Sequence, residues 1–303
     1  GGPLWRAGRA GPLLMTESAR PGLGQLTRRA AVGGLALGLA GAAPATRPRR
    51  VVSLNPCLDV ILFHVAERRQ IAALTHYARD PEASTLADRA LDIPITYETA
   101  EEVVALRPDL VLMSHHSAVA TRNALSRLGI PQAMFDVPQT VAASLAQIRQ
   151  VAQQLGQPAR GEAVVARIQA ALAAAAPPPG APKLSAIVYQ PNGFAAGAGT
   201  LTDEMLRRTG FENVAARYGL GRWGNIGLEQ IIADPPQVLL AGQAAAGAPT
   251  WADRVLSHPA LDRISGVMHR QAFPQRLLYC GGPVLIETAQ ALARARRNVL
   301  GTA

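Results

Sequence analysis

Short apolar runs alternate with segments of helical spacing along most of the chain. Runs that end at turn residues and are typical of buried strands are Arg50–Leu54, Ile71–Leu74, Leu110–Met113, Gln132–Phe135, Leu184–Tyr189, Val238–Leu240 and Arg276–Tyr279. Helical spacing or helix-ending residues mark Leu58–Val65, Thr121–Leu128, Val141–Leu155, Arg160–Ala176, Asp203–Arg208 and a terminal helix that Pro283 opens. Two further segments, Trp251–Leu261 and Arg263–His269, are expected to be helices or turns. Strands separated by helices form βαβ units, so the pattern predicts an α/β fold with mostly parallel sheets.

Two stretches repeat the same pattern of a short helix followed by a buried strand. Glu101–Met113 reads EEVVALRPDLVLM, and Glu229–Ala241 reads EQIIADPPQVLLA. In each copy a pair of β-branched residues, such as Val103 and Val104, is expected to face inward, and a proline ends the helix. A helix leading into a strand, used twice, predicts two similar α/β lobes.

One long helix is predicted between the two copies. It covers Arg160–Ala176 and stops at a run of three prolines and a glycine. A helix of this length extends about 25 Å, so it can join two lobes as a stiff connection. We therefore expect an N-terminal lobe over residues 46–158, a linking helix over 159–180 and a C-terminal lobe over 181–303.

The segment before the first strand has the features of an export signal. From Thr27 it reads TRRAAVGGLALGLAGAAPA, which is a pair of arginines, a weakly apolar run and a small-residue cleavage site ending at Ala45. The arginine pair is similar to a twin-arginine signal. Residues 1–45 are therefore predicted to be an N-terminal extension and a cleaved signal peptide, which leaves a soluble protein in the periplasm.

Composition and charge narrow the classes of function. The chain of 303 residues is 49% hydrophobic, which is enough for real cores, and its net charge of +9 is nearly all arginine, with Lys183 as its one lysine. Because no basic cluster is interleaved with aromatic residues, we do not expect a nucleic-acid partner. Motifs typical of hydrolases, nucleotide-binding enzymes and zinc proteases are missing from the sequence, so we do not expect an enzyme.

Several short motifs resemble one family when they are taken in order. They are VVSLNP at Val51–Pro56, ALRPDLV at Ala105–Val111, LGIP at Leu128–Pro131, Leu155-Gly156, and Trp223 shortly before Glu229. From Arg50 onward the chain resembles the periplasmic substrate-binding proteins of ABC importers for cobalamin and ferric siderophores. One departure is Asp59, where the family commonly has glutamate in its first helix.

The resemblance implies both a fold and a function. The fold would be two Rossmann-like lobes with mostly parallel sheets, joined by a long helix. The function would be to capture a corrinoid or a ferric-siderophore chelate between the lobes and deliver it to an inner-membrane permease dimer with its ATPase. We expect a monomer without a cofactor or a metal ion of its own. Alternatives that stay open are a haem or metal-ion binding protein, and a periplasmic sensor or enzyme on the same fold.

The resemblance also implies that one acidic residue on each lobe docks to the permease. Glu101 and Glu229 occupy matching places in the two copies of the repeat. Two carboxylates on rigid helix starts can register a partner that carries paired guanidinium groups. Glu102 is the alternative to Glu101 for this role. An acid at a helix start can also have no role beyond its favourable interaction with the helix dipole.

The ligand is expected at the carboxyl ends of the strands, where α/β sheets leave a crevice. Tyr77 and Trp223 match family positions that contact cobalamin, and their rings can sandwich a planar ligand. Arg222 is a candidate partner for an anionic chelate. The full set of predicted ligand-binding residues is Asn55, Tyr77, His115, His116, Asn192, Phe194, Arg222, Trp223 and Tyr279.

Two cysteines, Cys57 and Cys280, follow predicted strands in different lobes. They could form a disulfide, or a metal site together with His115. We expect two separately buried thiols instead, because a disulfide between lobes would impede their opening and because metal-ligand spacing such as CxxC is missing. His115 also remains a candidate axial ligand for a bound cobalt or haem iron.

Overall fold

The computed structural model describes residues 47–242, 259–262, 264 and 266–301. The predicted signal peptide and most of the helix or turn predicted over residues 251–261 lie outside the described residues. Residues 46–303 group into one compact unit, within which the strands form two separate sheets. No helix among the described residues is long and apolar enough to cross a lipid bilayer.

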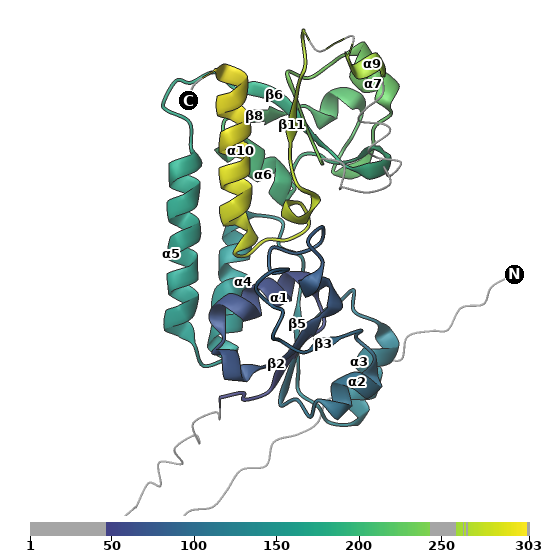
Figure 1. Cartoon of the computed structure of the whole chain (residues 1–303), viewed down its shortest axis with the longest axis vertical. Coiled ribbons are helices and arrows are strands. Elements are labelled where there is room, and N and C mark those ends of the chain that lie inside the picture. The colour runs from purple at the N-terminus through teal and green to yellow at the C-terminus, as the bar shows by residue number, and fades with distance from the viewer. Residues whose placement is uncertain (1–46, 243–258, 263, 265, 302–303) are drawn as a thin grey trace, which may run out of the picture. The chain divides into compact units, whose positions relative to one another are not determined.

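The N-terminal sheet has five strands, all parallel, in the order β3-β2-β1-β4-β5 (Figure 1). The strands are β1 (Val51–Ser53), β2 (Ile71–Thr75), β3 (Ile95–Thr96), β4 (Leu110–Ser114) and β5 (Gln132–Phe135). The helices that follow them are α1 (Pro56–Val65), α2 (Ala100–Ala105) and α3 (Val119–Arg127), with the 3-10 turns η1 (Arg68–Gln70) and η2 (His76–Arg79). The parallel α/β arrangement expected from the sequence is confirmed.

The C-terminal sheet has six strands and is parallel around its centre. Its order is β11-β10-β6-β7-β9, and β8 pairs with β6; only the pairs that involve β7 are antiparallel. The strands are β6 (Leu184–Tyr189), β7 (Phe194–Ala196), β8 (Phe211–Asn213), β9 (Trp223–Asn225), β10 (Val238–Ala241) and β11 (His269–Ala272). The helices are α6 (Leu201–Arg208), α7 (Leu228–Ala233), α9 (Pro259–Asp262) and α10 (Val284–Leu300), with η3 (Pro191–Gly193), η4 (Ala215–Tyr218) and η5 (Gln275–Leu277).

The sequence repeat is also a structural repeat. In the first copy α2 leads into β4, which pairs in parallel with β1, the first strand of its sheet. In the second copy α7 leads into β10, which pairs in parallel with β6, again the first strand of its sheet. The predicted inward pair is only half right, because Val103 is fully buried whereas Val104 is 37% exposed.

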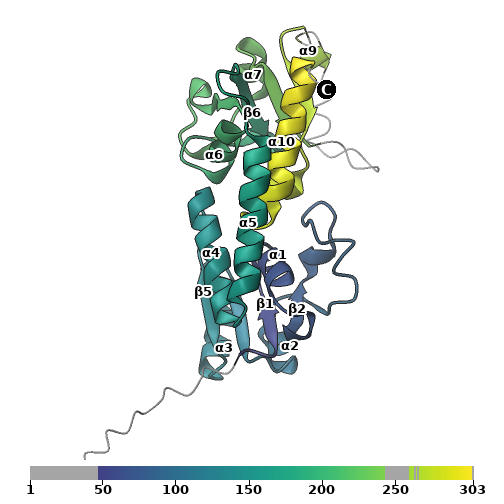
Figure 2. The ribbon, with the colours of Figure 1, turned by 90° about the vertical axis from the view of Figure 1, so that its left-hand side faces the viewer.

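Two long helices follow one another between β5 and β6. Helix α4 (Val141–Gln154) packs against α1 and α6, and α5 (Pro158–Ala175) packs against α4, α1 and α10. Figure 2 shows α5 running alongside α4 at one end and α10 at the other. The long helix predicted from sequence is therefore present, and it contacts helices that belong to both sheet regions.

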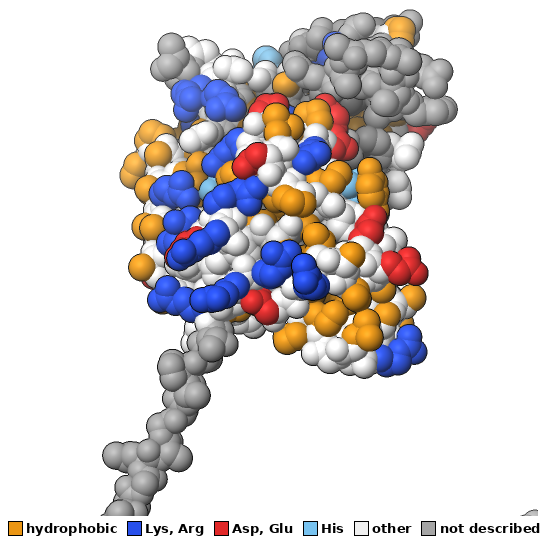
Figure 3. Space-filling model, turned by 60° about the horizontal axis from the view of Figure 1, so that its bottom comes forward, with side chains coloured by type: hydrophobic (Ala, Val, Ile, Leu, Met, Phe, Trp, Pro, Cys, Tyr) orange, Lys and Arg blue, Asp and Glu red, His pale blue; other side chains and the backbone are white. Residues whose placement is uncertain are grey.

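Arginine side chains gather on the face near the amino ends of the N-terminal strands (Figure 3). A hollow of about 760 Å³ lies there, lined by Arg47, Arg49 and Arg69 but also by Glu67 and Asp109. Asp109 accepts hydrogen bonds from the backbone N–H groups of Arg49 and Arg50. Because acidic groups alternate with basic ones and the hollow is at the opposite edge from the predicted ligand residues, we do not assign the ligand to it.

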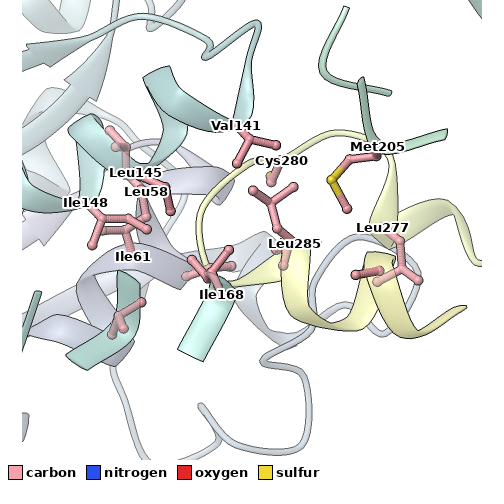
Figure 4. Packing of buried hydrophobic residues seen from close by; sticks show 14 of the residues in the cluster. Leu58, Ile61, Val141, Leu145, Ile148, Ile168, Met205, Leu277, Cys280 and Leu285 are labelled. Carbon is pink, nitrogen blue, oxygen red and sulfur yellow. The ribbon is translucent and has the colours of Figure 1, made fainter. Parts of the chain in front are cut away.

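One hydrophobic cluster extends from the N-terminal sheet to the C-terminal sheet. It contains Leu58 and Ile61 of α1, Ile168 of α5 and Leu285 of α10 (Figure 4). Cys280 belongs to the same cluster and is only 7% exposed. The packing of the two sheets is therefore continuous along the side that carries α4, α5 and α10.

The last strand differs from the prediction. Residues 276–279 were expected to form it, but Gln275–Leu277 is a 3-10 turn and the strand is β11, whose sequence is HRQA. β11 lies at the sheet edge and its residues are mostly exposed, so it lacks the apolar pattern of a buried strand. Leu277 is buried although it lies in a turn, which explains why the apolar run at this place was predicted to be a strand.

Candidate functional site

Three aromatic rings form a stack at the carboxyl edge of the N-terminal sheet. His76 and Tyr77 follow β2 directly, and Tyr97 follows β3. The ring centroid of His76 lies 4.0 Å from that of Tyr77 and 4.8 Å from that of Tyr97. Tyr77 is 40% exposed and Tyr97 63% exposed, so this stack presents aromatic surface to solvent. Nδ1 of His76 is buried without a hydrogen-bond partner among the described residues.

A second aromatic pair lies on the C-terminal sheet. Trp223 begins the edge strand β9, and Phe194 begins the neighbouring strand β7. Their rings are stacked, with centroids 5.7 Å apart and planes 8° apart, and Trp223 is 45% exposed. Phe194 and Trp223, both predicted as ligand-binding residues, are therefore brought together on one surface.

Next to each aromatic group, a hydrogen bond joins the N-terminal and C-terminal sheet regions. Nη2 of Arg222, next to Trp223, donates to Oε1 of Gln139 in the loop after β5 (3.0 Å). Nη1 of Arg276 donates to the carbonyl oxygen of Pro81, in the loop that follows Tyr77 (3.5 Å). Arg222 and the loop after Tyr77 are therefore each in contact with the opposite sheet region.

The other predicted ligand residues have varied surroundings. Oδ1 of Asn55 caps α1 by accepting from the N–H groups of Cys57 and Leu58, so its acceptor is already used. His115 and His116 are exposed after β4, and Nε2 of His115 is 3.5 Å from a carboxylate oxygen of Asp136. The remaining two are also exposed: Asn192, in the left-handed region at φ 61°, and Tyr279, whose hydroxyl group accepts a hydrogen bond from Gln275.

The expectation of two separate thiols is wrong. Cys57 and Cys280 form a disulfide, with Cα atoms 5.1 Å apart. Cys57 is in the first turn of α1 and Cys280 precedes α10, so the bond joins the N-terminal sheet region to the C-terminal one. A metal site built from these thiols and His115 is excluded, because the sulfur atoms are bonded to each other.

Asp59 is a completely buried acid that lies against Thr75, two residues before Tyr77. Its carboxylate accepts hydrogen bonds from the hydroxyl and the N–H of Thr75, the last residue of β2. Burial raises the pKa of Asp59 to about 7, while hydrogen bonds from Ser53 and Thr75 act in the opposite direction. Burial also raises the pKa of Glu98, which is close to His76.

The predicted docking acids are exposed, and the structure separates Glu101 from its rival. Oε2 of Glu102 accepts hydrogen bonds from the hydroxyl of Thr96 (2.8 Å) and from the N–H of Tyr97 (2.7 Å). These bonds lower the pKa of Glu102, and the bond from Thr96 has the largest effect. They also hold the Glu102 side chain at the start of its own helix. Glu101 is exposed and forms no ion pair with any described residue.

The second copy of the repeat has the same division of roles. Gln230, which corresponds to Glu102, accepts a hydrogen bond from the N–H of Gly227 (3.0 Å) and so serves the start of α7. Glu229 is exposed and has no ion-pair partner among the described residues. It lines a surface hollow of about 370 Å³ together with Tyr189 and Asn192. Figure 1 shows α2 and α7 both on the side away from α5.

Sequence reasoning placed His76 next to Tyr77 among the loop residues after strands, but it missed Tyr97 as the stacking partner of His76 and Gln139 as a partner of Arg222. Tyr97 follows a strand of only two residues, which is too short to produce a periodic signal. Within the described ranges, no group of three or more histidine, cysteine or acidic side chains is arranged to hold a metal ion.

Comparison with known proteins gives a consistent result. A family model described as "Periplasmic binding protein" matches residues 51–273. Among solved structures, the periplasmic heme-binding protein RhuT from Roseiflexus sp. RS-1 is 25% identical with a TM-score of 0.65, covering 83% of this chain and 98% of that one. A periplasmic heme-binding protein from Pseudomonas aeruginosa is 22% identical (TM-score 0.63; 82% and 92% covered).

The vitamin B12 binding protein BtuF of Vibrio cholerae is more distant in sequence but has the same fold. It is 16% identical with a TM-score of 0.60, covering 84% of this chain and 98% of that one. A search among curated protein sequences finds no significant match. The family model covers well over half of the chain and the fold agrees along nearly the whole length of these structures, so this chain belongs to the periplasmic binding protein family.

Proposed function

We propose that this protein captures a metal tetrapyrrole and delivers it to an ABC permease in the inner membrane. The tetrapyrrole that we favour is haem, and a corrinoid is the second choice. The proposal includes export by the signal in residues 1–45 and two lobes, residues 46–158 and 181–303, that hold the ligand between them. The observation that carries it is the pair of exposed aromatic groups, Tyr77 with its stack on one sheet and Trp223 with Phe194 on the other. Large planar rings are suited to such surfaces.

Haem takes precedence over a corrinoid or a siderophore because of Tyr77. A tyrosine oxygen is one of the axial ligands that proteins use for haem iron. The Tyr77 hydroxyl has no hydrogen-bond partner among the described residues, and contact with the His76 ring, tilted by 36°, orients the Tyr77 ring. The 25% identical structural relative is a heme-binding protein, which supports the same choice. Arg222, at the edge of the Trp223 surface, is suited to a ligand carboxylate.

The test is a titration of the purified protein with haemin, followed by visible absorption. Tyr77→Phe is expected to weaken haemin binding at least about tenfold, or about 1.4 kcal/mol, and to change the absorption bands that report the axial ligand. Tyr218→Phe is the matched control, because the Tyr218 hydroxyl bonds to the carbonyl oxygen of Asp234, away from the site. Tighter binding of cyanocobalamin or of a ferric siderophore than of haemin would overturn the choice of haem.

The proposal assigns Glu101 and Glu229 to permease docking. Both are the second residue of a six-residue helix, both are exposed, and in both copies the next residue forms the local hydrogen bonds of the helix start. The carboxylates of Glu101 and Glu229 therefore remain available to guanidinium groups of a partner. This division of roles favours Glu101 over Glu102.

The docking assignment predicts a loss of transport without a loss of ligand binding. Glu101→Ala/Glu229→Ala is expected to weaken binding to the cognate permease at least about thirtyfold, because breaking a desolvated charge pair costs about 2 kcal/mol or more. The measurement is uptake into proteoliposomes that contain the permease and its ATPase. Glu212→Ala/Glu287→Ala removes the same charge from two other exposed positions and should leave uptake unchanged. Equal uptake by both double variants would contradict the assignment.

A further inference from the structure

The disulfide is at the centre of a tight junction between the two sheet regions. The junction consists of Cys57 and Ser144 on the N-terminal side and of Cys280, Gly281 and Gly282 on the C-terminal side. The two cysteines are 223 residues apart in the sequence. Because only α5 and its flanking loops connect the two sides along the chain, the disulfide closes a second covalent link between them.

Cys57 is rigidly attached to the N-terminal sheet. It directly follows Pro56, the first residue of α1, and its N–H donates to the capping oxygen of Asn55 (2.9 Å). Asn55 in turn donates to Oγ of Ser114 at the end of β4 (3.4 Å). A force on Cys57 is therefore transmitted to the sheet and not absorbed by a loose loop.

Cys280 is attached equally firmly to the C-terminal side. It is buried, and it lines a small apolar space together with Val188 of β6, Phe273 and Leu285. The turn that precedes it is held by the hydroxyl of Thr288, which donates to the carbonyl oxygen of Leu277 (3.2 Å). Both ends of the disulfide are thus part of well-packed elements.

The two glycines after Cys280 allow an unusually close approach. A Cβ atom on Gly281 would lie 2.7 Å from Oγ of Ser144, and Gly282 has a φ of +70°. In this position the N–H of Gly282 donates to Oγ of Ser144 (2.6 Å). Nearby, the N–H of Val141 donates to the carboxylate of Glu204 on α6 (2.8 Å). Two backbone N–H groups of the junction region therefore bond across from one side to the other.

We infer that the Cys57–Cys280 disulfide is a redox-sensitive clasp that keeps the two sheet regions together at this junction. While it is intact, the sheet regions can rotate about the junction but cannot separate there. Once it is reduced, only the hydrogen bonds and the apolar contacts of the junction oppose separation. The inference concerns the movement of the protein itself and does not depend on the identity of the ligand.

The clasp would be opened by a dithiol reductant. Cys57 is the less buried of the two cysteines, so its sulfur is the one that a thiolate can reach. Attack there releases the Cys280 thiolate, and the second thiol of the reductant then displaces Cys57. The reductant becomes a cyclic disulfide, and the protein gains two thiol groups.

Amide hydrogen exchange by NMR tests the clasp directly. In the oxidised protein, the N–H groups of Gly282 and Val141 should be protected, because each bonds across the junction. After reduction by a dithiol, with two thiols per chain confirmed by titration, both should exchange at least tenfold faster. The Cys57→Ser/Cys280→Ser variant should behave like the reduced protein. Amides within β1 and β6 should keep their rates, which would exclude general unfolding.

A second variant separates opening from a local loss of one bond. Ser144→Ala removes the acceptor of the Gly282 N–H and should accelerate the exchange of that amide, but not that of Val141, in the oxidised protein. An unchanged exchange rate at Val141 after complete reduction would overturn the inference. An increase at Val141 in oxidised Ser144→Ala, equal to that caused by reduction, would also overturn it, because the hydrogen bond and not the disulfide would then be the clasp.

Discussion

The Cys57→Ala/Cys280→Ala variant is expected to have a free energy of unfolding about 5 kcal/mol lower than the oxidised protein, since the bond closes a very long loop in the unfolded chain. The two cysteines are separated by 223 residues. For a protein of this size such a loss corresponds to a fall of about 10 to 20 °C in the midpoint of thermal unfolding. Chemical denaturation followed by circular dichroism measures the difference.

A dithiol reductant provides the control for this prediction. When both proteins are fully reduced, the difference between them should shrink to about 1 kcal/mol, which is the scale of a small change in the packing of Cys280. A difference that persists under reducing conditions would mean that the side chains and not the covalent link carry the stability. Equal stability of the two proteins under oxidising conditions would contradict the prediction outright.

The Asp59→Asn variant is expected to be more stable than the original protein above pH 7 and similar to it near pH 4. Burial raises the pKa of Asp59 from 3.8 to about 7, so the folded protein binds this proton more tightly than the unfolded chain does. The contribution of Asp59 to the free energy of unfolding is therefore greatest below pH 4 and is lost as the pH rises through 7. The total loss for this group is about 4 kcal/mol. Asparagine cannot ionise, and its side-chain oxygen can still accept the hydrogen bonds from Thr75.

Denaturant unfolding at pH 5 and at pH 8 measures this effect. The difference in free energy of unfolding between Asp59→Asn and the original protein should grow by about 3 kcal/mol between these two pH values. Asp88→Asn, at an exposed position, is the matched control and should show no such change. A difference that does not vary with pH would show that Asp59 is not protonated in the folded protein near neutral pH.

Local patterns were sufficient for most of the architecture. The strands over Gln132–Phe135 and Leu184–Tyr189 have the predicted bounds, because each is an apolar run ended by turn residues. The long helix was also predicted, since helical spacing is a local signal. Strands β3 and β11 were not, because one has two residues and the other lies exposed at an edge.

The candidate site could be predicted only in part. Tyr77 lies at the expected edge, directly after β2, because the carboxyl ends of parallel strands share one edge. Phe194 and Trp223 were also expected in loops, but they begin the short strands β7 and β9. Their stacking partners did not follow from sequence. His76 meets Tyr97 across two neighbouring strands, and Arg222 meets Gln139 across two sheets. Such contacts depend on strand order and on the packing of the two sheets, which sequence spacing does not contain.

The sequence by itself determined the alternation of strands and helices, the duplicated helix and strand, and the family, because each depends on residues that are neighbours in the chain. Only the tertiary structure decided that Cys57 and Cys280 are bonded and that Glu102, unlike Glu101, is used by its own helix start. The physical reason is distance: a bond between atoms 223 residues apart, or a hydrogen bond from a short strand that has no pattern of its own, exists only after the chain has folded.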